Sequence, residues 1–407
     1  MGIQKINKMS VNAWFYYLMS ILILLFFLGL IYNPLGNQLN VFYWKTNNLL
    51  GDFFNVQIYI ADWDPYHNTV DGMSEKCYPP LAYLFMELFN GFYEYSGAHL
   101  VECYNSTAAM MSGYMFVLIS LALYFHSLSC LCDIPAKLRF VLLFSSVILF
   151  SLERGNIIIL CAAFVVYFWA FKDSSDVIKR KFALICLCAA SVMKIYPAIF
   201  GVFLLKEKRF KDIAFVFLLS CILFFLPFLC FEHGLTNFTQ LLSNLEAFED
   251  HYNSVLAARV IPRFSITDYP ILLMDRLNTD YTLVYNLLRI IVIFLSLLTV
   301  FVFKCESKQW KQYALLSMIV LYLPKHSVWY CGLYFIPAIV LFLHQKRFEN
   351  RDWVYMILFC ILLNPLQIGG NNGLYSFTII CSNIALIVVW LMLITDNTRA
   401  FHSCLKK

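Results

Sequence analysis

Residues 138–171 read LRFVLLFSSVILFSLERGNIIILCAAFVVYFWAF, and they show most clearly which fold class the chain adopts. Two apolar runs flank the polar turn Glu153-Arg154-Gly155-Asn156. Each run is too short to cross alone a hydrocarbon core about 30 Å thick, which takes about 20 helical residues. Because irregular polar backbone cannot face lipid, such a turn must end in a cavity that is lined by protein or filled with water. The alternative is that the short helices tilt in a locally thinned bilayer.

The rest of the chain repeats this pattern among longer apolar runs. Hydrophobic residues make up 61% and charged residues 14%, against about 45–50% and 25% in soluble domains. Runs long enough to span a membrane alone lie at 13–32, 108–131, 212–231, 281–303 and 374–395. Shorter runs lie at 138–152, 156–171, 182–195, 197–205, 313–324, 329–343 and 353–364. The sequence predicts an all-α, polytopic integral membrane protein of about 11–13 spans, several of them short paired helices.

Basic residues indicate the orientation of these spans. They gather between alternate spans, at 137–139, 172–181, 206–211, 304–311 and 346–351. The positive-inside rule places these turns in the cytoplasm, together with both termini. The polar turns and two large loops, 34–107 and 232–280, then lie outside. We expect interfacial helices at 81–95 and 238–248 in these loops.

The chain shows no internal repeat and no Gly/Ser-rich or Pro-rich linker, which favours one integrated domain over residues 1–407. The run 13–32 is longer than the apolar core of a signal peptide, so we interpret it as the first membrane helix. Cys77 and Cys103 share the first outer loop, where a disulfide between them is conceivable. No zinc-type pair of cysteines and no nucleotide-binding loop is present, and neither a metal nor a cofactor is predicted.

Asp52 lies in an apolar, aromatic setting at 49–54, where a carboxylate is costly to desolvate without a partner or a task. One interpretation is a general base that takes a proton from an attacking hydroxyl. The other is an N-cap for a helix that begins at Phe53.

A set of cations maps to the outer side, against the positive-inside rule: Arg154, Lys194, Arg259, Arg263, Lys325 and His326. Cations near apolar depth favour a functional site, and a phosphate that arrives with a lipid is their natural partner. The alternative is internal pairing, such as Glu153 with Arg154, or snorkelling to the interface.

Two further stretches of the first outer loop carry aromatic and proline residues, Asp62-Trp63-Asp64-Pro65-Tyr66 and Cys77-Tyr78-Pro79-Pro80-Leu81. Such residues can form the rigid walls of a sugar pocket, with carboxylates that accept hydrogen bonds from sugar hydroxyls. The alternative is a turn followed by a helix that begins at proline. Asp62 and Asp64 have the spacing of a sugar-nucleotide motif, but nucleotide sugars are not supplied on the outer side.

Taken in order, these residues resemble the GT-C superfamily of membrane glycosyltransferases, and most of all glycosyltransferase family 87. The resemblance extends over residues 45–340 and rests on Asp52, Pro65-Tyr66, Tyr78-Pro79-Pro80-Leu81, Gly155-Asn156, Lys194-Ile195-Tyr196-Pro197, Asn253-Ser254-Val255-Leu256 and Ser327-Val328-Trp329. The chain departs from the family pattern in lacking a Gln beside Asn156 and another between Asn253 and Ser254.

The resemblance implies an inverting transfer of a hexose, mannose or glucose, from a polyprenyl-phosphate-sugar donor to a glycan or glycolipid acceptor. It implies that Asp52 is the catalytic base. The phosphate ligands that it implies are Lys194, Arg154, Arg259 and Lys325. The implied sugar and acceptor pocket comprises Asp64, Tyr66, Tyr78, Asn156, Tyr196, Asn253, Ser254, His326 and Trp329. Fixed cations can replace a metal in this scheme.

The expected location is the cytoplasmic membrane of a bacterium, with the active site on the periplasmic or outer face. Two other functions stay open at the level of sequence. A lipid-linked polysaccharide polymerase or ligase would also use outer arginines but would not need Asp52. A flippase or transporter of lipid-linked sugar would need no catalytic carboxylate.

Overall fold

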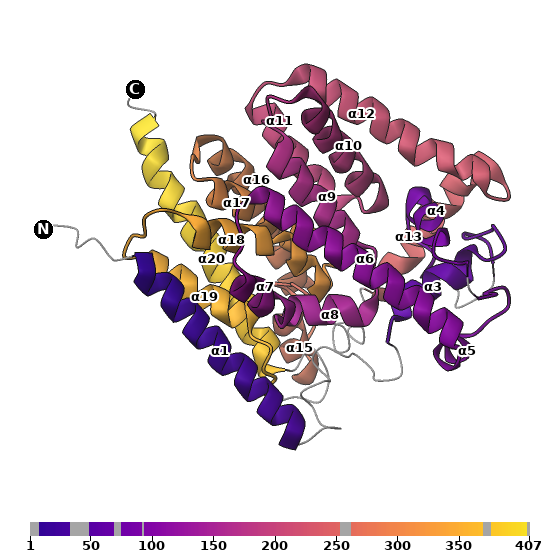
Figure 1. The fold of residues 1–407 in the computed structure, drawn as a ribbon, viewed down its shortest axis with the longest axis horizontal. Helices are drawn as coiled ribbons and strands as arrows, with labels where there is room; N and C mark the ends of the chain where they lie inside the picture. Colours follow the sequence, from indigo (N-terminus) through magenta and orange to yellow (C-terminus); the bar gives the residue numbers. More distant parts are fainter. Residues whose placement is uncertain are drawn as a thin grey trace, which may run out of the picture. The chain divides into compact units, whose positions relative to one another are not determined.

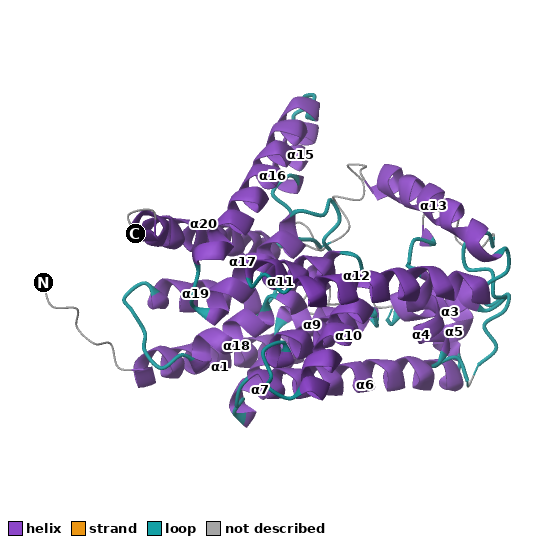
Figure 2. Ribbon diagram, turned by 90° about the horizontal axis from the view of Figure 1, so that it is seen from above, coloured by secondary structure: helices purple, strands orange, loops and turns teal. Residues whose placement is uncertain are grey.

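The computed structural model describes residues 8–32, 49–68, 75–91, 93–252, 262–368 and 376–404. Within these ranges the regular elements are all helices, and Figure 2 shows helices and loops without a strand. An isolated antiparallel bridge joins Arg263 to Val328. The predicted all-α fold is confirmed.

Five helices are long and apolar enough to span a membrane, and they coincide with the five long runs of the sequence. They cover Val11–Tyr32, Thr107–Leu131, Phe210–Cys230, Thr282–Cys305 and Phe377–Asp396. Much of their apolar surface is exposed, and α12 (Phe210–Phe225) buries none of its residues. Water does not tolerate so large an apolar surface, whereas lipid does. The chain is therefore a polytopic integral membrane protein.

The shorter runs form helices too, but not always single ones. Runs 156–171 and 353–364 form α9 (Ile158–Phe171) and α19 (Asp352–Leu363). Run 138–152 instead forms α7 (Ala136–Leu143) and α8 (Ser146–Arg154). The Ser145 hydroxyl donates to the Leu142 carbonyl at 2.6 Å and accepts the Ile148 N–H at 3.4 Å. Its local hydrogen bonds thus compete with those of a continuous helix.

Two other short runs also change helix type along their length. The run at 197–205 forms the 3-10 helix η2 (Tyr196–Gly201) and then α11 (Val202–Lys206). The run at 329–343 forms η5 (Trp329–Tyr334) and then α18 (Ile336–His344). Proline lies in the first turn of both η2 and α18, where its missing N–H costs no hydrogen bond.

The chain divides into two compact units, and the boundary crosses α8 between residues 150 and 151. We call residues 45–131 and 151–257 the first-loop unit, and residues 1–44, 132–150 and 258–407 the terminal unit. That these units form one integrated domain stays a prediction.

In the first-loop unit, α9 packs between α6 (Thr107–Leu131) and α10 (Val177–Met193), and α12 packs on α10 (Figure 1). The two segments that the sequence predicts to lie outside add α3 (Gly51–Ile60), α4 (Pro80–Glu87), α5 (Leu100–Asn105) and α13 (Asn237–Tyr252). Helix α4 begins at Pro80 after the extended Pro79, as expected for a proline-initiated helix. It ends at Glu87, so the helix expected at 81–95 is shorter than predicted.

The terminal unit is built around α17 (Gln309–Tyr322), which is buried from Trp310 to Tyr322. Helices α16 (Thr282–Cys305), α18 and α20 (Phe377–Cys404) pack against it. Helix α1 (Lys8–Tyr32) packs on α19 and α7. The unit also holds α15 (Asp268–Arg276), which leads into α16.

Candidate active site

Asp52 lies in the first turn of α3, but it does not cap that helix. Leu50 occupies the N-cap position, and no side chain caps the helix there. The Asp52 carboxylate instead receives hydrogen bonds from across the unit. Its Oδ1 accepts from Arg154 Nε at 3.0 Å and also from Arg154 Nη2, and its Oδ2 accepts from Asn156 Nδ2 at 2.7 Å. The N-cap interpretation of Asp52 is therefore wrong.

Both charges of this ion pair lie at helix ends that favour them. Asp52 is in the first turn of α3 and Arg154 is in the last turn of α8. The helix macrodipole stabilises an acid near the N-terminus and a base near the C-terminus. Arg154 is buried and Asp52 is partly buried, so solvent screens their attraction less than at an open surface. Both helix ends therefore favour this ion pair.

Leu50 fixes α3 against the turn that follows α8. Its N–H donates to the Glu153 carbonyl at 2.6 Å, and its φ of 60° is in the left-handed region. Two glycines make room for its side chain. A Cβ at Gly113 would meet Leu50 Cδ1 at 2.6 Å, and one at Gly155 would meet Leu50 Cδ2 at 3.0 Å. The glycines thus let the Leu50 side chain pack closely against α6 and the turn after α8, beside the pair of Asp52 and Arg154.

Asn156 links Asp52 to Tyr78. Its amide nitrogen donates to Asp52 Oδ2 and to the Tyr78 hydroxyl at 2.9 Å. Its Oδ1 accepts the N–H of Ile158 at 3.0 Å at the start of α9, which fixes which way the amide faces. The Lys194 ammonium lies 4.1 Å from the centre of the Tyr78 ring. We call Asp52, Tyr78, Arg154, Asn156 and Lys194 the Asp52 cluster.

Glu153 lies beside this cluster, and the sequence did not single it out as a site residue. Its side chain is buried, with 2% of its surface exposed, and neither oxygen has a hydrogen-bond partner among the described residues. Burial raises the pKa of Glu153 to about 8; Arg154 opposes this shift and Asp52 adds to it. At neutral pH Glu153 therefore holds its proton, and Arg154 forms its ion pair with Asp52. The predicted pairing of Glu153 with Arg154 is replaced by this arrangement.

Other predicted pocket residues of the first-loop unit have different partners. The Tyr66 hydroxyl donates to the Tyr78 carbonyl at 3.0 Å and so supports the backbone of the cluster. Asp64 Oδ1 lies 3.0 Å from His67 Nδ1. Tyr196 begins η2, two residues after Lys194, and is half-buried. Cys77 and Cys103 are free thiols, so the conceivable disulfide is not formed.

The predicted residues of the terminal unit form a separate group. Arg263 Nε donates to Asp268 Oδ2 at 2.5 Å, and Arg263 Nη1 lies 3.1 Å from His326 Nδ1. Trp329 is buried and stacks on Phe264, with ring centres 4.4 Å apart. Lys325 is exposed. Internal pairing therefore accounts for Arg263, and the predicted residues Asn253, Ser254 and Arg259 lie outside the described residues.

Comparison with known proteins gives one match. Residues 77–326 match the family model of glycosyltransferase family 87, which is more than half of the 407 residues. No curated protein and no solved structure matches the chain. The matched range contains four residues of the cluster, Tyr78, Arg154, Asn156 and Lys194. The chain belongs to glycosyltransferase family 87 and is a membrane glycosyltransferase of the GT-C type.

Proposed function

We propose that this protein transfers a hexose, mannose or glucose, from a polyprenyl-phosphate-sugar to a glycan or glycolipid on the outer face of a bacterial cytoplasmic membrane. The reaction inverts the anomeric centre, and Asp52 is the general base. The observation that carries the proposal is the Asp52 cluster, in which an oriented carboxylate and a lysine are linked through Asn156 and Tyr78.

The hydrogen bonds of Asp52 suit it to accept one proton. Each carboxylate oxygen can accept about two hydrogen bonds. Oδ1 accepts two from Arg154, whereas Oδ2 accepts one from Asn156. Oδ2 therefore keeps a lone pair for the hydroxyl of an acceptor sugar. As that proton moves to Oδ2, the acceptor oxygen attacks the anomeric carbon and the bond to the phosphate breaks.

A phosphate leaves without a proton if cations stabilise its charge, so one base is enough for this reaction. Lys194 is the cation we assign to this task. It lies at the end of α10, where the chain becomes extended, and its ammonium packs over Tyr78 rather than in an ion pair with Asp52. The predicted contributions of Arg259 and Lys325 stay predictions, because Arg259 lies outside the described residues and Lys325 belongs to the terminal unit.

An apolar groove supports a donor that is linked to a lipid. It has a volume of about 460 Å³ and is lined by residues of α10, η2, α11 and α12. Ser191 and Ile195 line it on either side of Lys194 in the sequence, and further residues of its wall are Leu187, Phe217, Cys221 and Phe224. Such a groove suits an isoprenoid chain, because its apolar wall offers van der Waals contacts in place of those with lipid. A chain bound there would bring its phosphate to Lys194.

The test is glycosyl transfer by the purified protein in detergent, with polyprenyl-phosphate-mannose or polyprenyl-phosphate-glucose as donor and a crude membrane fraction as acceptor. We expect wild type to release polyprenyl phosphate and Asp52→Asn to bind the donor without turnover. Glu94→Gln is the matched control, since Glu94 is an exposed carboxylate of the same outer loop. Equal turnover by Asp52→Asn would remove this residue from the mechanism. No turnover with either donor would favour a polymerase, ligase or flippase.

A further inference from the structure

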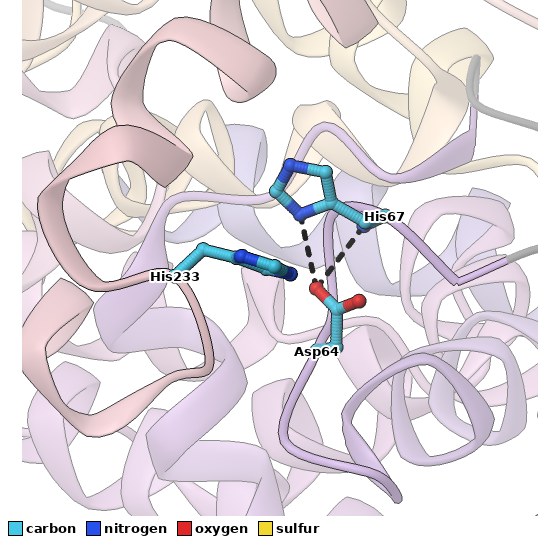
Figure 3. A group of neighbouring side chains, drawn as sticks. All are labelled: Asp64, His67 and His233. Carbon is cyan, nitrogen blue, oxygen red and sulfur yellow. Dashed lines mark hydrogen bonds and ion pairs between the residues drawn. The ribbon is translucent and has the colours of Figure 1, made fainter.

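Three metal-binding side chains meet in the first-loop unit, and none of them belongs to the Asp52 cluster. One ligand atom from each of Asp64, His67 and His233 can be chosen so that all three lie within 4.8 Å of one another. Figure 3 shows both imidazole rings beside the Asp64 carboxylate. Residues 64 and 67 belong to the outer segment after α3, and His233 follows α12. We propose that these three residues bind a divalent transition-metal ion, of which Zn²⁺ fits best.

The donor set determines the class of ion. Two imidazole nitrogens and one carboxylate oxygen form the three-ligand set of open zinc sites, in which water completes the coordination. Mg²⁺ and Ca²⁺ prefer a shell made of oxygen atoms alone. Imidazole suits Zn²⁺, Ni²⁺, Cu²⁺ and Fe²⁺, and three ligands of this kind leave positions open on each of them.

The ligand atoms lie near the separations of a tetrahedral zinc site and would need only small movements to reach them. Bonds of about 2.0–2.2 Å in tetrahedral geometry place two ligand atoms about 3.3–3.6 Å apart. His67 Nδ1 and Asp64 Oδ1 are 3.0 Å apart, and no pair in the group exceeds 4.8 Å. Both histidines are exposed, so their rings can turn by the remaining distance without disturbing a packed core. The ion would bind between His67 Nδ1 and Asp64 Oδ1, which now lie within hydrogen-bonding distance of each other.

The two backbone segments that carry the ligands are already held together. The Glu232 N–H donates to the Trp63 carbonyl at 2.9 Å, and the rings of Trp63 and Phe231 pack at 6.4 Å. Trp63 and His233 both have left-handed backbones, with φ of 57° and 67°. This conformation costs about 1–2 kcal/mol per non-glycine residue and persists where the surrounding structure requires it. The fold thus fixes the positions from which the three side chains converge.

A bound ion would join the outer segment after α3 to the segment after α12. Because it binds the folded state, it should raise the melting temperature of the protein. It would also make Asp64 a metal ligand, where the sequence indicated a sugar-binding residue. The proposal does not depend on the donor or acceptor of the transferase.

The test is metal binding by the full chain, purified in detergent through a tag without histidine and stripped with EDTA. Co²⁺ is the spectroscopic probe and Zn²⁺ the competitor. We expect one Co²⁺ per chain with the visible absorption of a low-coordinate site, displacement by Zn²⁺, and a melting temperature that Zn²⁺ raises by a few degrees. His67→Ala, His233→Ala and Asp64→Asn should each weaken binding at least about tenfold.

Two matched variants control for the residue type. Asp62→Asn changes the neighbouring carboxylate, which accepts a hydrogen bond from Ser96 Oγ at 2.5 Å. His99→Asn changes an exposed histidine at the N-cap of α5 and keeps a capping residue. Both should bind Co²⁺ as wild type does. Melting temperatures in EDTA establish that each ligand variant is folded. Binding by the folded ligand variants that equals wild type, or no stoichiometric binding by wild type, would overturn the proposal.

Discussion

Replacing Gly155 with alanine should separate Asp52, the proposed base, from its partners without touching a charged group. Gly155 has a φ of 61° and follows Arg154 directly. A Cβ at this position would meet Leu50 Cδ2 at 3.0 Å, Phe53 Cβ at 3.1 Å and Leu50 Cα at 3.4 Å. The contact with Leu50 Cα is an ordinary one, but Leu50 Cδ2 and Phe53 Cβ must give way by a few tenths of an ångström, and Phe53 directly follows Asp52.

Two costs add at this position. A left-handed backbone costs about 1–2 kcal/mol for a residue other than glycine. Overpacking adds about 1–3 kcal/mol, so the free energy of unfolding should fall by about 2–5 kcal/mol. A shift of about 1 Å at a reacting group lowers the rate by about 10²-fold, so a shift of a few tenths of an ångström should lower kcat by about tenfold.

Gly97→Ala provides the matched control for strain. Gly97 has a φ of 67°, but nothing lies within 4 Å of the position of its Cβ. This variant should lose only the 1–2 kcal/mol of backbone strain and keep the wild-type kcat. Thermal unfolding in detergent and release of polyprenyl phosphate, measured on both variants, separate the two costs. If Gly155→Ala matches Gly97→Ala in both stability and kcat, the close approach of Leu50 does not position Asp52.

Two further variants test the electrostatics of the cluster. Asn156→Ala removes the charged hydrogen bond to Asp52, which is worth about 1.5–3 kcal/mol, so kcat should fall about 10- to 100-fold in the same assay. Glu153→Gln tests the pKa raised from 4.5 to about 8. The stability that follows from this shift is complete below pH 4.5, declines as pH rises through about 8, and amounts to at most about 5 kcal/mol. Thermal unfolding between about pH 5 and pH 9 should therefore show a loss of stability in wild type that the variant lacks. The same loss of stability in both proteins would refute the raised pKa of Glu153.

The long membrane helices were predictable because hydropathy over about 20 residues reports directly on lipid exposure. The break between α7 and α8 was not, since it depends on the Ser145 hydroxyl, whose local bonds give no signal in the hydropathy pattern. The transition from η2 to α11 is of the same kind. In each case the local backbone conformation divides a run that is predominantly apolar in sequence.

The sequence predicted which residues belong to the candidate site, but not which of them contact one another. Asp52, Arg154 and Asn156 each stand out as polar groups in apolar surroundings. Their contact joins residues 102 and 104 positions apart, and only the folded chain shows it. Leu50 and Gly113 could not have been found, because a leucine in an apolar run and a glycine in a membrane helix carry no distinguishing pattern. These two residues let their segments pack closely, and such a pairing of segments is visible only in the folded chain.

The neutral form of Glu153 leaves the positive charge of the Asp52 cluster uncompensated. Within the cluster, the formal charges are −1 on Asp52 and +1 each on Arg154 and Lys194. The cluster and the adjacent Glu153 together carry +1 while Glu153 is protonated and 0 when it is ionised. Under the proposed function, the phosphate of the donor is attracted to the first state and not to the second. A phosphate bound near Glu153 would in turn raise its pKa further, because the two negative charges repel. Under the proposed function, burial of Glu153 in its neutral form thus preserves the positive charge that would attract an anionic lipid donor.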